Sequence, residues 1–187
     1  MATPGVIPAP VERRAAALEV RASGRLVGYA ATFGSVAAIG RVRETIAPGA
    51  FRASLAEGGD ILALLDHDPG KLLARTRSGS LKLHEDSKGL AFELDLPDTQ
   101  SGADVLALAT RCDLGGMSFG FSVPKGGEQW QGEQRTLTRV NLHEISIVSA
   151  HPAYPDTSIA LRAMPGLIDR ERRQRALVLA EVARAVG

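Results

Sequence analysis

The sequence has little cysteine and no excess of charge of either sign. Its 187 residues include a single cysteine, Cys112, which excludes an internal disulfide framework and a multi-cysteine zinc site. This use of cysteine fits a reducing, cytoplasmic setting. The 22 Lys and Arg residues are balanced by 21 Asp and Glu residues, and the formal net charge is +1. Composition therefore gives no electrostatic argument for a nucleic-acid partner, and we expect none.

The sequence also lacks a long apolar run. No stretch approaches the roughly 18 consecutive apolar residues of a membrane-spanning helix. The first residues lack the basic and then apolar segments of a secretion signal, so we expect a soluble protein with no membrane partner. No His-x-x-x-His or paired-cysteine spacing occurs, so we also expect no metal site and no cofactor.

Composition divides the chain into three parts. Residues 1–17 hold three of the ten prolines and are expected to form a flexible N-terminal segment. Residues 18–163 are expected to form one compact domain, and a domain of this length can bury a sizeable core. Residues 164–187 carry an apolar stripe among arginines and predict an amphipathic basic helix. The stripe fits packing against the domain and contact with a partner equally well.

Short strands bounded by turn-forming residues dominate the central part. A hairpin is predicted around Ser23-Gly24, and a buried strand over residues 61–65. Residues 71–76, 80–84 and 90–96 are expected to form a meander. The other strands are predicted at 41–46, 114–123, 128–131, 134–148 and 158–162. Helices are predicted over 50–57 and from the capping residues 98–101 to Cys112.

Many short strands with few helical patterns indicate a mainly β fold of the α+β class. We expect a closed or nearly closed antiparallel β-barrel, with a few helices packed outside it.

Residues 115–121, Gly-Gly-Met-Ser-Phe-Gly-Phe, place Ser118 between glycines and bulky apolar side chains. They match the Gly-x-Ser-x-Gly pattern of a nucleophile elbow, which requires a strand, a turn and a helix around the serine. Here a strand-like segment, 119–123, follows Ser118, and no Asp occurs between Ser118 and His151. We interpret the segment as a strand that displays Ser118 either as a nucleophile or as an inert core serine. Its glycines would leave room for a substrate backbone.

A serine hydroxyl is a weak nucleophile until a base takes its proton, so the histidines matter. His67 follows the most apolar run of the chain, where partial desolvation would keep an imidazole neutral, as a general base requires. His84 lies beside Glu85-Asp86 and is expected on the surface. His143 and His151 lie downstream of Ser118.

Residues 142–148 predict a strand in which either His143 or Glu144 points inward, because alternate side chains face opposite sides. A buried glutamate needs a partner, and a histidine base would supply one. Alternatively, Glu144 lies at the rim and pairs with an arginine.

Six short motifs follow one another between Val27 and Arg162. They are Gly-Tyr-Ala-Ala-Thr-Phe at 28–33, Glu-Thr-Ile-Ala-Pro-Gly-Ala-Phe at 44–51, Leu-Asp-His-Asp-Pro at 65–69, Met-Ser-Phe-Gly-Phe at 117–121, Leu-His-Glu-Ile-Ser-Ile-Val at 142–148 and Pro-Ala-Tyr at 152–154. In their order and spacing they resemble the prohead serine proteases of tailed bacteriophages, which are relatives of the herpesvirus assembly proteases.

The resemblance implies a herpesvirus-protease-like β-barrel with His67 as the general base, Ser118 as the nucleophile and Glu144 as the group that orients His67. The herpesvirus relatives use a second histidine in the third role, so His143 stays an alternative. In those relatives a loop after the third residue holds the oxyanion through backbone N–H groups. That loop corresponds here to Ser149, Ala150, His151, Ala153 and Tyr154.

The implied function is a serine endopeptidase of prohead maturation. Its substrates would be the scaffold and the major capsid protein, cleaved inside the assembling procapsid in the bacterial host cytoplasm, and it would also cleave its own ends. The basic helix over 164–187 would contact the shell or form a homodimer. The alternative is a non-catalytic scaffolding or capsid-assembly protein that retains the barrel. A virus, a prophage and a gene-transfer particle are equally compatible with the sequence.

Overall fold

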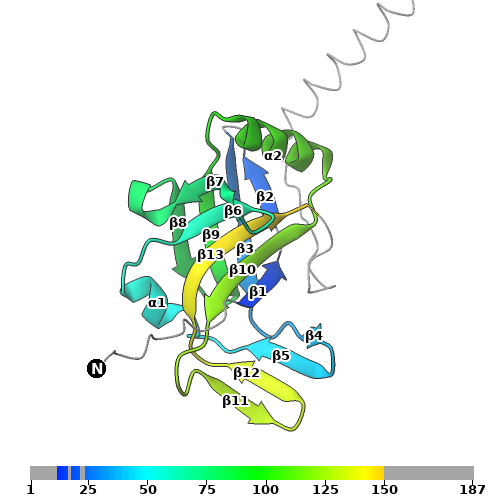
Figure 1. Ribbon diagram of the computed structural model, residues 1–187, viewed down its shortest axis with the longest axis vertical. Helices are drawn as coiled ribbons and strands as arrows, with labels where there is room; N and C mark the ends of the chain where they lie inside the picture. The colour runs from blue at the N-terminus through cyan, green and yellow to red at the C-terminus, as the bar shows by residue number, and fades with distance from the viewer. Residues whose placement is uncertain (1–11, 17, 22–23, 150–187) are drawn as a thin grey trace, which may run out of the picture.

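The computed structural model describes residues 12–16, 18–21 and 24–149 (Figure 1). Within these residues the chain is mostly β-structure with few helices. The expected strand at 158–162, the helix at 164–187 and most of the expected oxyanion loop lie outside the described residues. The division of the chain at residues 17/18 and 163/164 stays a prediction.

The strands form three sheets. The five-stranded sheet has the order β1 (Glu12–Ala16), β10 (Gly116–Ser122), β13 (Asn141–Val148), β6 (Leu62–Leu65), β7 (Asp68–Arg75). The second has the order β2 (Leu18–Arg21), β3 (Arg25–Thr32), β9 (Gly89–Asp95), β8 (Leu81–Glu85). The third has the order β11 (Glu128–Gln131), β12 (Gln134–Leu137), β5 (Val42–Ile46), β4 (Ala37–Ile39). The helices are α1 (Arg52–Ala56), α2 (Gln100–Arg111) and the 3-10 turn η1 (Thr76–Ser78).

All three sheets are open, so the closed barrel that we expected is not found among the described residues. Nor is the pairing purely antiparallel, because β13 runs parallel to β6 and β12 runs parallel to β5. Alternating apolar residues specify which face of a strand is buried, but they do not specify the direction of its neighbours. The likeness to the herpesvirus protease fold stays a prediction.

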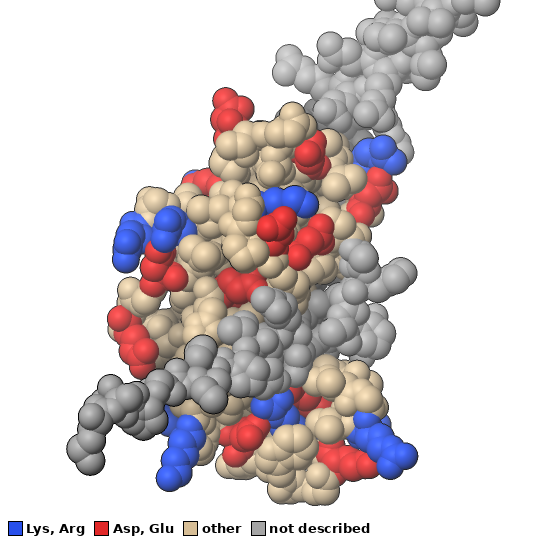
Figure 2. Space-filling view, viewed as in Figure 1, with Lys and Arg blue, Asp and Glu red and all other residues tan. Residues whose placement is uncertain are grey.

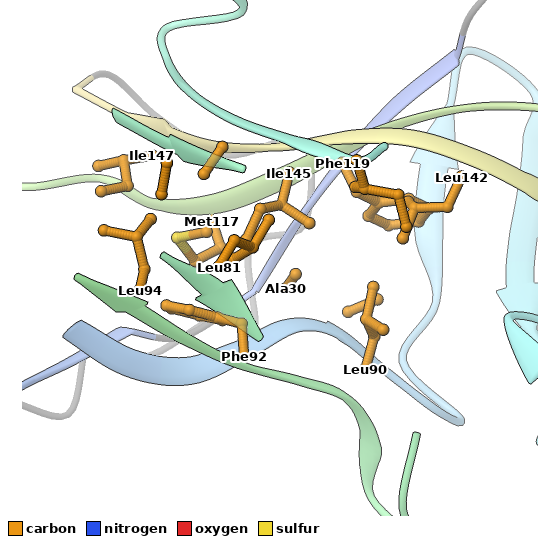
Figure 3. Close-up of a cluster of buried hydrophobic side chains, with 14 of the residues drawn as sticks. Ala30, Leu81, Leu90, Phe92, Leu94, Met117, Phe119, Leu142, Ile145 and Ile147 are labelled. Atoms are coloured by element: carbon orange, nitrogen blue, oxygen red, sulfur yellow. The ribbon is translucent and has the colours of Figure 1, made fainter. Parts of the chain in front are cut away.

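The core lies between the five-stranded sheet and the second sheet. Figure 3 shows side chains of β10 and β13 facing those of β8 and β9 across this space. They are Met117, Phe119, Ile145, Ile147, Leu81, Leu90, Phe92 and Leu94, each at most 2% exposed. Burial of a side chain of this size contributes about 1.5–3 kcal/mol. This packing fixes which residues of β10 and β13 face the core, and therefore which residues face the opposite way.

The expected hairpin and the expected long helix are confirmed. β2 pairs antiparallel with β3, with Arg21 opposite Arg25. α2 begins after Thr99, whose side chain accepts a hydrogen bond from the Gly102 N–H. It ends at Arg111 and is followed by Cys112, which adopts a left-handed conformation.

Two expectations about the strands are wrong. β7 pairs with β6 rather than with β8, because η1 carries the chain from the first sheet to the second, and this removes the meander. The single strand expected over 134–148 is divided at residues 138–140, whose N–H groups bond to the carbonyls of Gly127 and Ala50. Residues 12–16, at the end of the segment expected to be flexible, form β1 and pair with β10.

Charged side chains of both signs are mixed on one face of the molecule (Figure 2). On the face drawn in Figure 2, Lys and Arg side chains lie among Asp and Glu side chains and do not gather into one basic patch. This distribution matches the balanced charge of the sequence.

An ion pair joins the beginning of β6 to the end of β7. The Arg75 guanidinium donates to both carboxylate oxygens of Asp60, and the Arg77 N–H also donates to Asp60. The hydrogen bond from Arg75 is the main cause of a pKa for Asp60 below its ordinary value.

We expect Asp60→Asn to lower the midpoint of urea unfolding at neutral pH. Because folding lowers the pKa of Asp60, its stabilisation is fully present above the ordinary aspartate pKa of about 3.9 and is lost as the pH falls through the folded-state pKa. The difference between Asp60→Asn and wild type should therefore shrink at about pH 3. Glu133→Gln is the control, because Glu133 is exposed and forms no ion pair within the described part of the chain. An equal decrease in the urea midpoint of Asp60→Asn at both pH values would contradict this account.

Candidate active site

Ser118 lies in the middle of β10, on the face that points away from the core. Its neighbours Met117 and Phe119 are both buried in the core, and strand alternation sends Ser118 to the opposite face. Ser118 is 5% exposed. The serine is inside a strand, as we expected, and not at a strand-to-helix turn, so the Gly-x-Ser-x-Gly match is coincidental.

β13 places two further polar side chains on the same face. Ile145 and Ile147 face the core, so Glu144 and Ser146 face the other way. Ser146 lies opposite Ser118 in the antiparallel pair β10/β13. Side chains directly opposite in such a pair have Cβ atoms about 4.5–5.5 Å apart, so Ser118 and Ser146 are neighbours.

His67 reaches this face from the hairpin turn between β6 and β7. Leu65 pairs with Asp68, which leaves a two-residue turn of Asp66 and His67. Their φ angles are 52° and 58°, as a tight hairpin turn of the I′ type requires. For residues other than glycine, this conformation costs on the order of 1–3 kcal/mol each. Two hydrogen bonds to β13 offset the cost: the Asp66 N–H donates to the Ile147 carbonyl at 2.8 Å, and the His67 N–H donates to Ser146 Oγ at 2.9 Å.

The imidazole of His67 contacts the carboxylate of Glu144. His67 Nδ1 lies 2.7 Å from Glu144 Oε1, and the two side chains are 20% and 7% exposed. An ionised carboxylate accepts a hydrogen bond and cannot donate one, so with Glu144 ionised the hydrogen of a neutral imidazole lies on Nδ1 and Nε2 keeps its lone pair. The contact therefore fixes both the orientation of the ring and the nitrogen that is free to accept a proton.

Gly120 makes the position of Glu144 possible. The two residues are directly opposite in the β10/β13 pair. A Cβ atom at Gly120 would lie 2.5 Å from Glu144 Oε1 and 2.8 Å from its Cγ. Glu144 therefore fills the space beside Gly120, and the expectation that this glycine leaves room for a substrate backbone is wrong.

His143 does not take part in this arrangement. It is the extra residue of a β-bulge, because Gly120 pairs with Glu144 and the next residue, Phe121, pairs with Leu142. His143 is exposed, and its Nε2 lies 2.9 Å from Ser122 Oγ. The structure thus brings Glu144, and not His143, to His67.

Of the residues expected in an oxyanion loop, only Ser149 is described. Its N–H and its hydroxyl donate to the Asp66 carboxylate at 2.7 and 2.9 Å. The Ser149 N–H is therefore already occupied. Ala150, His151, Ala153 and Tyr154 lie outside the described residues.

The Ser118 hydroxyl forms no hydrogen bond with any described residue. The bond from a nucleophile to its base is often long or poorly aligned until a substrate is bound. Ser118 and the His67–Glu144 pair lie on one face of one sheet. A serine, a histidine and a carboxylate are the groups that serine hydrolases use.

Residues 12–16, 18–21 and 24–149 contain neither a side-chain cluster for a metal ion nor a membrane-spanning helix. No group of three or more His, Cys, Asp or Glu side chains is placed there to hold a metal ion. Within the same ranges no helix has both the length and the apolar character to cross a membrane.

The serine, histidine and carboxylate on one sheet face are the combination expected of a serine hydrolase. The chain matches the family model of the caudovirus prohead serine proteases over residues 11–166, so it belongs to this family. No curated protein and no solved structure matches the chain. The resemblance seen in the sequence is thus confirmed, and membership implies a serine peptidase that matures capsids in the prohead.

We expect Gly120→Ala to break the His67–Glu144 contact, because the added Cβ displaces the carboxylate. In proton NMR of protein with nitrogen-15-labelled histidine, the His67 Nδ1 proton should give a downfield resonance in wild type and lose it in Gly120→Ala. Gly59→Ala should retain the resonance, because nothing lies within 4 Å of a Cβ at Gly59. An unchanged resonance in Gly120→Ala would show that Glu144 is not held as described.

Proposed function

We propose that the chain is a serine endopeptidase that cleaves the scaffold and the major capsid protein during prohead maturation. The observation that carries this proposal is the contact between His67 Nδ1 and Glu144 Oε1, on the sheet face that also presents Ser118. Membership of the prohead protease family supplies the class of substrate.

In the proposed reaction Ser118 Oγ attacks the carbonyl carbon of the scissile peptide bond, and its proton passes to His67 Nε2. Glu144 stabilises the imidazolium that forms and keeps the ring oriented. When the tetrahedral intermediate collapses, the C–N bond breaks and the leaving amine takes the proton from Nε2. A water molecule then attacks the acyl-enzyme with His67 again as the base, which releases the acid and restores Ser118.

For two parts of this mechanism, the third member of the triad and the oxyanion donors, we propose fewer residues than the sequence alone suggested. Glu144 is the proposed third member, since His143 bonds to Ser122 instead of to His67. The oxyanion donors are proposed within residues 150–154 and no longer include the Ser149 N–H, which donates to Asp66. Pro152, the one proline in that segment, cannot donate.

The remaining features are proposed from the family. Cleavage would take place inside the assembling procapsid in the bacterial host, and the protease would also remove its own ends. The basic segment over residues 164–187 is the proposed contact with the shell or with a second copy.

We expect Ser118→Ala to leave the major capsid protein and scaffold uncut when the three proteins are produced together. A fluorophosphonate probe should label wild type at Ser118, and the change to Ala should abolish labelling. His67→Ala and Glu144→Gln should slow labelling by roughly 10⁴-fold, because they remove the base and the group that orients it.

Ser122→Ala is the matched control, because Ser122 is another buried serine of β10 and bonds to His143. It should be labelled like wild type and should process the capsid protein normally. Normal processing by Ser118→Ala would defeat the proposal.

A further inference from the structure

Ser146 is a fully buried hydroxyl in the centre of the candidate site. It is 0% exposed and lies in β13 between Ile145 and Ile147. Ser118 is opposite it in β10, and Leu64 is opposite it in β6. Because burial of a hydroxyl is costly unless it is hydrogen-bonded, the partner of Ser146 indicates the role of its side chain.

That partner is the backbone of His67. The His67 N–H donates to Ser146 Oγ at 2.9 Å, across 79 residues of sequence. The imidazole of the same residue contacts Glu144, two positions away on the same face of β13. His67 is thus attached to one face of one strand at two points, by its backbone and by its ring.

The turn that carries His67 depends on such attachments. Asp66 and His67 both have positive φ, in a turn that favours Asn and Gly. Their partners come from the end of β13 and the residue after it: Ile147 accepts from the Asp66 N–H, Ser146 accepts from the His67 N–H, and Ser149 donates to the Asp66 carboxylate. The conformation of the turn is therefore imposed by β13.

We propose that Ser146 is a positioning residue for the reaction assigned to Ser118, His67 and Glu144. Its hydroxyl holds the backbone of His67 so that the imidazole lies against Glu144 and presents Nε2 to Ser118. The inference rests on the proposed function. Because Ser146 is fully buried, it cannot reach a substrate, and it acts only through His67.

Ser54 supplies a matched comparison for a purely structural role. Its Oγ accepts the Leu142 N–H, also at 2.9 Å, and its residue is 8% exposed. Ser54→Ala and Ser146→Ala therefore each remove one buried hydroxyl that accepts one backbone N–H. Of these two hydrogen bonds, only the one accepted by Ser146 holds His67.

The experiment compares wild type, Ser146→Ala, Ser146→Thr and Ser54→Ala as full-length chains. Fluorophosphonate labelling measures the reaction, in which a bond forms from Ser118 Oγ to phosphorus, fluoride leaves and His67 takes the proton. The maximal labelling rate is separated from probe affinity by varying the probe concentration. Urea unfolding measures stability, and proton NMR of the His67 Nδ1 proton measures the position of the ring.

We expect Ser146→Ala and Ser54→Ala to shift the urea midpoint by similar amounts. Ser146→Ala should lower the maximal labelling rate by about 10–100-fold with little change in probe affinity, and it should broaden or remove the Nδ1 resonance. Ser54→Ala should keep the wild-type labelling rate and the Nδ1 resonance. Ser146→Thr keeps the hydroxyl and should recover most of the maximal labelling rate.

Wild-type labelling and an intact Nδ1 resonance in Ser146→Ala would overturn the inference. If wild type itself is not labelled, the proposed function fails, while the NMR comparison still decides whether Ser146 positions His67. If Ser146→Ala does not fold, Ser146→Cys takes its place, since it keeps a similar volume with a much weaker acceptor.

Discussion

The hydrogen bond between His67 and Glu144 is the contact on which the site depends. It joins the turn after β6 to the middle of β13. The strands β6 and β13 are parallel neighbours in the same sheet. The apolar core fixes this geometry, because Ile145 and Ile147 must face it and Glu144 must then face the other way. Stability and the proposed chemistry thus rely on the same strand pairing.

The buried carboxylate of Glu144 needs a hydrogen-bond partner and space within the sheet. The Glu144 side chain is 7% exposed, and a carboxylate taken out of water needs a partner. His67 supplies that partner, and Gly120 supplies the space. The glycine and the serine that first suggested a nucleophile elbow lie in one proposed site: Ser118 is the proposed nucleophile, and Gly120 leaves space for Glu144, the proposed orienting group.

The sequence predicted the mainly β class, the β2–β3 hairpin, the helix α2 and the family. It also singled out Ser118, His67 and Glu144, which the fold brings to one sheet face. It did not predict the open sheets or the parallel pairs, because alternation specifies a face and not a neighbour. The attachment of the His67 backbone to Ser146 was also missed. Ser146 was visible as a polar residue among isoleucines, but its partner lies 79 residues away.

The most direct test of the account is a crystal structure of the chain after reaction with the fluorophosphonate probe. We predict a covalent bond from Ser118 Oγ to phosphorus, with His67 Nε2 within hydrogen-bond distance of that oxygen and Nδ1 still on Glu144. A phosphonate attached to another residue, or a His67 ring turned away from Ser118 with its contact to Glu144 broken, would contradict it.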